Sequence, residues 1–217
     1  EQVKPPCGPQ GQLPIWAEAD AICRAVRSHS VAVVVAETGS GKSTQLPQML
    51  DAACVGGGGR VLCTQPRKIA AISLAQRVAS ECGRGPLGGH VGYKVGCGNE
   101  RMSHSTRLLF CTDRVAVRML QEDPSLPGIG VVIADEAHER SLWTDLLLAA
   151  LKRSLAAAPH LRVVITSATI DPTVFQSFFA RGVGGSETTE EVPVISAGGR
   201  VFPVSVQWLQ AGGRQAG

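Results

Sequence analysis

The chain has 217 residues, with 21 Lys and Arg against 18 Asp and Glu, which gives a formal net charge of +3. Hydrophobic residues make up 44% and aromatic residues 4% of the chain, enough apolar material to bury the core of one α/β domain and too much for a disordered chain. This composition excludes a coiled coil, a collagen-like fibre and a membrane span.

Short apolar runs rich in β-branched residues alternate along the chain with helical patterns. The runs are apolar at nearly every position, as expected of strands buried on both faces of a parallel sheet. Alternating units of this kind place helices on both faces, so the fold class predicted is an α/β three-layer sandwich around a mostly parallel sheet. Strands are predicted at Val31–Val35, Arg60–Thr64, Arg107–Cys111, Val131–Ala134 and Arg162–Thr166, and helices at Ala17–Arg27, Ser43–Ala53, Lys68–Glu81, Arg114–Glu122, Leu142–Ala157 and Thr173–Phe179.

Local patterns give three further expectations. The Gly-rich segments Gly56–Gly59 and Gly182–Gly185 are interpreted as flexible loops without a function. An extended pattern resumes at Val201–Leu209. The helix predicted at Lys68–Glu81 has one apolar face, formed by Ile69, Ile72, Leu74, Ala75 and Val78.

The seven cysteines form no C-x-x-C pair and are odd in number, which indicates neither a zinc ribbon nor a disulfide scaffold. Cys23, Cys63 and Cys111 stand among apolar residues and are predicted to be buried thiols. With no signal-peptide pattern at the start, reduced cysteines favour an intracellular protein, nuclear or cytoplasmic. The chain begins at Glu1 without Met, as expected of a domain excised from a longer protein.

The strongest motif follows the first predicted strand, at the kind of strand end where open α/β sheets bind ligands. A Gly-rich loop joins this strand to a helix, which is the context of a phosphate loop; a Gly-rich turn with an incidental lysine is the alternative. Gly39 and Gly41 let backbone N–H groups surround an anion, and Lys42 adds a charge for the β- and γ-phosphates. Ala36 replaces the usual first Gly, which is acceptable if its φ is negative. The predicted nucleotide-binding residues are Glu37, Thr38, Gly39, Ser40, Gly41, Lys42, Ser43 and Thr44.

Two adjacent carboxylates, Asp135 and Glu136, follow the strand predicted at Val131–Ala134. Adjacent acids repel each other unless they share a cation. Ser43, Asp135 and Glu136 are therefore predicted at a Mg²⁺ site, with Asp135 acting through water. Glu136 is also predicted to orient and deprotonate the attacking water, which together with Lys42 and Asp135 makes up the catalytic set. A solvated loop or a helix N-cap is the alternative.

Weaker signals stand near these acids. His138 follows them, and Ser167-Ala168-Thr169 ends the last predicted strand. A lone histidine is most often a hydrogen-bonding surface or core residue, and small hydroxyls are common in turns. Beside the other strand ends, Ser167 and Thr169 are predicted to hydrogen-bond with the acidic motif and sense nucleotide state, with His138 as a third coupling residue.

In this order, the motifs resemble the first RecA-like domain of a DEAH/RHA-type superfamily 2 RNA helicase. The resemblance runs from about Leu13 to Leu209 and implies an N-terminal extension at 1–12, a RecA-like ATP-binding domain at 13–197, and at 198–217 the start of a linker to a second RecA-like domain. It is carried by the phosphate loop, Thr64-Gln65-Pro66-Arg67-Lys68, Ala75-Gln76-Arg77-Val78-Ala79, Asp135-Glu136-Ala137-His138 with Glu139-Arg140, Ser167-Ala168-Thr169 and Gly199-Arg200-Val201-Phe202-Pro203-Val204.

The resemblance also implies roles for residues outside the phosphate loop and the acidic motif. Arg67 and Lys68 are expected to contact the RNA backbone, with a solvated basic pair as the alternative. Thr112 and Asp113 align with a further RNA-contacting motif. Arg77 matches an arginine that stacks on adenine, a cation–π role, with a plain surface arginine as the alternative.

The function implied is that of an ATP-dependent RNA helicase translocating 3′ to 5′, with this chain as its nucleotide-binding half. The cofactors implied are ATP or another NTP and Mg²⁺. The partners implied are single-stranded or structured RNA, a second RecA-like domain, C-terminal helicase domains and adaptor proteins, with no membrane. Two other classes stay open: a superfamily 2 DNA translocase, and a degenerate domain serving as an RNA-binding scaffold. The scaffold class draws support from two departures from the family pattern, Arg114 in place of glycine and the altered turn at Gly96-Cys97.

Overall fold

The five predicted strands form the centre of the sheet in a computed structural model that describes residues 4–6, 9–168, 171–180 and 191–198. Each begins and ends within two residues of its predicted bounds because a continuous apolar run suits a strand covered on both faces. They are β1 (Val31–Ala36), β2 (Arg60–Gln65), β5 (Leu108–Thr112), β6 (Ile129–Ala134) and β7 (Arg162–Ser167).

Three shorter strands complete the sheet. They are β3 (Val91–Lys94), β4 (Glu100–Arg101) and β8 (Val194–Ala197). The order is β4-β3-β5-β2-β6-β7-β1-β8, and every pair of neighbours is parallel except β3 and β4. The predicted mostly parallel sheet is therefore confirmed, with three more strands than the apolar runs indicated.

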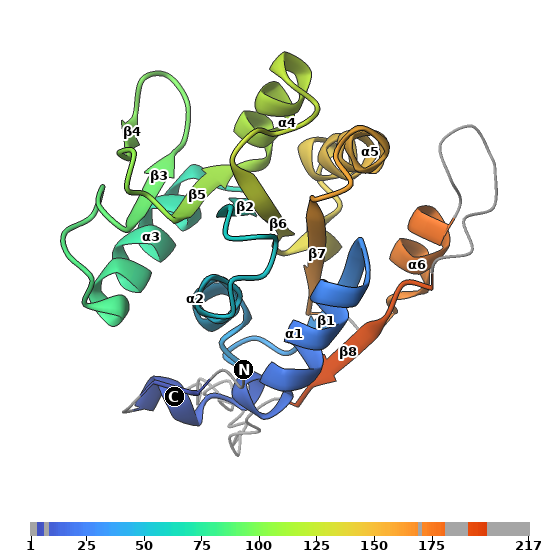
Figure 1. The fold of residues 1–217 in the computed structure, drawn as a ribbon, viewed down its shortest axis with the longest axis horizontal. Coiled ribbons are helices and arrows are strands. Elements are labelled where there is room, and N and C mark those ends of the chain that lie inside the picture. The colour runs from blue at the N-terminus through green and yellow to red at the C-terminus, as the bar shows by residue number, and fades with distance from the viewer. Residues whose placement is uncertain (1–3, 7–8, 169–170, 181–190, 199–217) are drawn as a thin grey trace, which may run out of the picture.

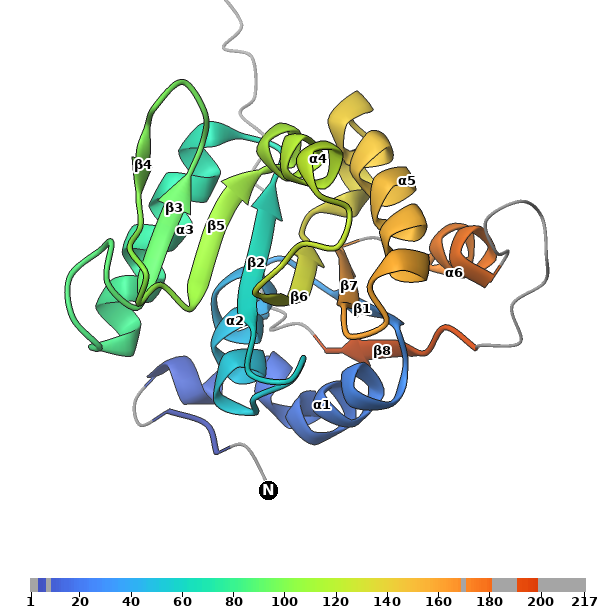
Figure 2. The same ribbon diagram turned by 45° about the horizontal axis from the view of Figure 1, so that its top comes forward.

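All six predicted helices are present. Three 3₁₀ turns are also described: η1 (Pro9–Gln12) and η2 (Pro14–Glu18) precede α1, and η3 (Ala137–Glu139) lies between β6 and α5. Figures 1 and 2 show α1, α2 and α3 on one face of the sheet and α4, α5 and α6 on the other. The helices are α1 (Ala19–Ser28), α2 (Lys42–Ala52), α3 (Lys68–Cys82), α4 (Asp113–Glu122), α5 (Leu142–Ala157) and α6 (Thr173–Ala180).

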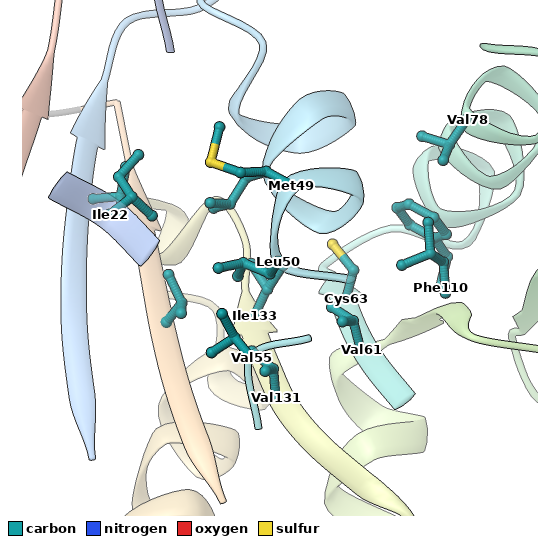
Figure 3. Close-up of a cluster of buried hydrophobic side chains, with 14 of the residues drawn as sticks. Ile22, Met49, Leu50, Val55, Val61, Cys63, Val78, Phe110, Val131 and Ile133 are labelled. Carbon is teal, nitrogen blue, oxygen red and sulfur yellow. The ribbon is translucent and has the colours of Figure 1, made fainter. Parts of the chain in front are cut away.

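Alternate residues of a strand belong to two different apolar cores, one on each face of the sheet. Ala32 and Val34 of β1 belong to the core under α1–α3, whereas Val31 and Val33 belong to the core under α4–α6, as the period of two in a strand requires. Figure 3 shows part of the first core, where Met49 of α2 and Phe110 of β5 are fully buried. Two cores on opposite faces of one sheet make the three layers that the sequence predicted.

The thiols of Cys23, Cys63 and Cys111 are buried and unpaired, as predicted. Burial raises the pKa of the Cys63 and Cys111 thiols well above the ordinary value, so both stay protonated at neutral pH.

No helix in the described ranges is long and apolar enough to cross a membrane.

One local prediction is wrong: Ile69 does not belong to the apolar face of α3, because it lies in the first turn of the helix and is 80% exposed. Gly56–Gly59 lies in the connection between α2 and β2, as predicted, and its two end residues pack against Gly130 at the start of β6. A Cβ on Gly56 would lie 2.5 Å from the Gly130 oxygen, and one on Gly59 would lie 2.5 Å from the Gly130 nitrogen. These glycines allow two backbones to touch. The segments Gly182–Gly185, Gly199–Val204 and Val201–Leu209 lie outside the described residues.

Candidate active site

The candidate site lies where four neighbouring strands end. β2, β6, β7 and β1 are consecutive and parallel, so their carboxyl ends form one edge of the sheet. In the register, Ala134 of β6 is opposite both Thr64 of β2 and Ile165 of β7. The residues that follow therefore stand in one row: Gln65, Asp135 and Thr166.

The predicted phosphate loop joins β1 to α2 and has the backbone of an anion cradle. Gly39 and Gly41 have φ of +86° and +97°, in the left-handed region that favours glycine. Gly41 is the N-cap of α2 and no side chain caps the helix, so its first backbone N–H groups are available to a phosphate. Ser40 is fully buried, and its Oγ has no hydrogen-bond partner among the described residues. Ala36 is not among the residues with positive φ, so an alanine is acceptable where a phosphate loop usually has its first glycine.

The other predicted nucleotide-binding residues surround this cradle. Glu37 and Thr38 are exposed in the loop, while Ser43 and Thr44 are half-buried in the first turn of α2. The Ser43 hydroxyl is thus carried by the helix turn that directly follows the loop, as the predicted Mg²⁺ role requires.

Lys42 connects the loop to the acidic motif. Its side chain is 4% exposed, and Nζ lies 3.0 Å from Oε1 of Glu136. Glu136 has φ of +55°, which costs a non-glycine residue about 1–3 kcal/mol and persists only where the surroundings impose it. Its backbone N–H donates to Oγ1 of Thr166 at 3.3 Å, and that bond together with Lys42 fixes the unusual turn.

His138 holds the other oxygen of Glu136. The backbone N–H of Ala168 donates to Nδ1 of His138 at 3.3 Å, so a neutral ring carries its proton on Nε2. That Nε2 lies 3.4 Å from Oε2 of Glu136. The ring therefore joins the backbone after β7 to the acidic motif, and its coupling role stays a prediction.

Asp135 is held on both oxygens. Its side chain is 1% exposed; Oδ2 accepts from Nε2 of Gln65 at 2.5 Å, and Oδ1 accepts from the hydroxyl of Thr166. The sequence analysis assigned no role to Gln65 or Thr166, although a polar residue at the end of an apolar strand is a signal that could have found them.

The predicted coupling hydroxyls have different placements. Ser167 is fully buried at the end of β7, and Thr169 lies outside the described residues. A further hydroxyl of β7, that of Thr166, contacts both acids, and the coupling roles of Ser167 and Thr169 stay predictions.

Arg67 and Lys68 are exposed at the start of α3, as an RNA-contacting pair requires. Arg67 is 75% exposed, and its Nη2 lies 3.3 Å from Oε1 of Glu139 in η3. The structure thus places Arg67 beside the acidic motif, at the same edge of the sheet as the phosphate loop.

The Thr112 and Asp113 side chains are buried, at 6% and 1% exposure, and RNA contact by this segment stays a prediction. The Asp113 carboxylate accepts from the hydroxyl of Thr144 at 2.6 Å and so connects α4 to α5. Burial raises the pKa of Asp113, while the Thr144 hydroxyl acts in the opposite direction by stabilising the charged form. This residue has a structural role that a motif alignment could not reveal.

Arg77 lies on α3 and is 67% exposed. Its Nε lies 2.6 Å from Oε1 of Glu81, whose other oxygen accepts from Gln45 of α2 at 2.8 Å. The guanidinium is therefore at the surface beside α2, where a base could stack on it, and adenine stacking stays a prediction.

The residues present fit a Mg²⁺ ion bound together with phosphates. Among the described residues no group of three or more His, Cys, Asp or Glu could form a metal cage. Mg²⁺ at phosphate sites needs only one or two carboxylates, since phosphate oxygens and water supply the rest. With two of about four lone-pair positions used, the Asp135 carboxylate retains acceptor capacity on each oxygen.

Comparisons with known proteins agree with this geometry. The family model for DEAD/DEAH box helicases matches residues 17–177. The chain is 41% identical over 208 residues to the ATP-dependent RNA helicase dhx29 of Xenopus laevis, covering 92% of this chain and 14% of that protein. It is 42% identical to the probable ATP-dependent RNA helicase DHX34 of Homo sapiens, covering 89% and 16%. For the DExH-box ATP-dependent RNA helicase DExH3 of Arabidopsis thaliana the identity is 42%, covering 91% and 16%. The chain thus spans about a sixth of these relatives or less.

Proposed function

Because the chain belongs to the DEAD/DEAH box helicase family, we propose that it is the nucleotide-binding half of an ATP-dependent RNA helicase. One observation carries the proposal: Nζ of Lys42 lies 3.0 Å from Glu136, which joins the phosphate loop to the acidic motif. Nucleotide use follows from the family, whereas ATP with Mg²⁺ and RNA are the ligands we propose for this chain.

We propose that the loop N–H groups and Lys42 bind the β- and γ-phosphates. Mg²⁺ held by Ser43 and Asp135 would neutralise phosphate charge and orient the γ-phosphoryl group. Phosphate gives Lys42 a second anionic partner, which leaves Oε1 of Glu136 available to orient and deprotonate the attacking water. His138 keeps the carboxylate in place through Oε2.

RNA would bind along the same edge of the sheet. Arg67 and Lys68 are exposed there and are suited to backbone phosphates, while the 4% aromatic content limits base stacking. Translocation 3′ to 5′ requires the proposed second RecA-like domain, which would follow the linker proposed at 198–217. C-terminal helicase domains, adaptor proteins and an intracellular location, nuclear or cytoplasmic, complete the proposal.

Calorimetric titration of the chain with ADP and Mg²⁺, and then with single-stranded RNA and single-stranded DNA, tests the proposal. Binding of nucleotide and preferential binding of RNA are expected. Comparable affinity for DNA would favour the DNA translocase, and RNA binding without nucleotide binding would favour the scaffold. Absence of both activities in a folded chain contradicts the proposed function.

A further inference from the structure

The carboxylate of Asp135 cannot rotate freely, because each of its oxygens accepts a hydrogen bond from a different strand. Gln65 of β2 donates to Oδ2 and Thr166 of β7 donates to Oδ1. All three side chains are buried, at 2%, 0% and 1% exposure for Gln65, Thr166 and Asp135.

The sheet order explains why these two residues reach the same carboxylate. β6 lies between β2 and β7, and the register puts Gln65 and Thr166 beside Asp135 on either side. Residues at matching register positions on neighbouring strands point to the same face. The two contacts therefore come from rigid strands rather than from loops.

We propose that Gln65 is a positioning residue for the Mg²⁺ carboxylate, an inference that rests on the proposed function. Its amide N–H group fixes the plane of the Asp135 carboxylate, so the remaining lone pairs are directed consistently toward the metal and its water. Partners of this kind orient a ligand without touching the metal, and losing one typically lowers metal affinity about 10- to 100-fold.

Gln65 is better suited to this role than an ionisable residue. Its amide donates to a carboxylate without adding charge, so Asp135 keeps its full negative charge for the cation. The hydroxyl of Thr166 complements Gln65. It donates a hydrogen bond to Asp135, while its oxygen accepts one from the Glu136 N–H at 3.3 Å. The same network thus orients both acids.

The test separates binding of Mg²⁺ from binding of nucleotide. ADP affinity of the chain is measured by calorimetry with Mg²⁺ and with a chelator, and the ratio of the two dissociation constants gives the gain from Mg²⁺. Gln65→Met keeps an unbranched side chain and removes the donor. The expected result is ADP affinity within twofold of the native chain under chelator, and a Mg²⁺ gain reduced about tenfold or more.

Leu62→Ala is the matched control, since Leu62 is a buried residue of the same strand that belongs to the core on the α4–α6 face. It should lower the free energy of unfolding but leave the Mg²⁺ gain unchanged. Thr166→Val removes the other donor and should reduce the gain as Gln65→Met does, so it provides the same test if Gln65→Met does not fold.

The outcomes distinguish the positioning role of Gln65 from the proposed function. A full Mg²⁺ gain in folded Gln65→Met or Thr166→Val overturns the positioning role and leaves the proposed function intact. A reduced gain in Leu62→Ala as well would also overturn it, because general destabilisation would then explain the effect. No ADP binding by the folded native chain would instead overturn the proposed function.

Discussion

Substitution of Lys42 by Ala tests the phosphate loop most directly. The ammonium group is 4% exposed and lies 3.0 Å from Glu136, so it is already desolvated and oriented before a phosphate arrives. A charge-assisted hydrogen bond from such a group contributes about 1.5–3 kcal/mol. Lys42→Ala should therefore weaken binding of ADP with Mg²⁺ by about 10- to 150-fold.

The same change should have a smaller effect on folding. Glu136 is 26% exposed and keeps His138 as a partner, so its carboxylate is not left unpaired in a dry core, where breaking an ion pair costs about 3–5 kcal/mol. Calorimetry measures the affinity and denaturant unfolding the stability. Lys152→Ala is the control, because Lys152 lies on α5, on the opposite face of the sheet from α2. An unchanged ADP affinity in Lys42→Ala would refute the phosphate-loop assignment.

Three further predictions concern hydrolysis, stability and the isolated chain. Glu136→Gln should keep ADP affinity within about twofold yet block RNA-stimulated ATP hydrolysis in the full-length protein, because it removes a base and not a phosphate ligand. Normal ATP turnover in this variant would contradict the catalytic role of Glu136. Burial raises the pKa of Asp113 in the folded state, so its ionisation costs stability as the pH rises above about 3.9. Asp113→Asn should therefore become more stable relative to the native chain between about pH 3 and 7 in denaturant unfolding, and a pH-independent difference would contradict this. The chain alone should bind nucleotide but hydrolyse ATP poorly with or without RNA. An arginine finger is typically worth about 10³–10⁵ in rate, and no arginine of this chain lies in a motif resembling the arginine-finger motif of the family. Steady-state turnover equal to that of the full-length protein would contradict this prediction.

The central strands and all six helices were predictable because they depend on local patterns. An apolar run buried on both faces, or an apolar residue every three or four positions, is visible in the sequence itself. β3 and β8 have four residues each and β4 has two charged residues, Glu100 and Arg101. Such strands are defined by pairing with a neighbour, as β4 is by β3, and no local pattern reports that pairing.

Contacts between distant segments could not be predicted from local patterns. Only the fold brings Gly130 against Gly56 and Gly59. The burial of Asp113 was not predicted because its partner Thr144 stands on a different helix. Gln65 and Thr166 were missed as partners of Asp135 for the same reason, since their proximity depends on the order β2-β6-β7. Residue types at strand ends predicted the chemistry, whereas strand order determines which side chains meet.

Strand order also suggests how nucleotide state would be transmitted. β7 lies between β1, which leads into the phosphate loop, and β6, which leads into the acids. Lys42 must therefore reach across the end of β7 to meet Glu136. Thr166 of β7 contacts both acids, and Ala168, just after β7, contacts His138. A phosphate bound beside Lys42 would change the charge next to Glu136 and, through it, next to His138. We expect these two side chains to respond before the strands do, because β7 is paired in parallel with a neighbour on each side.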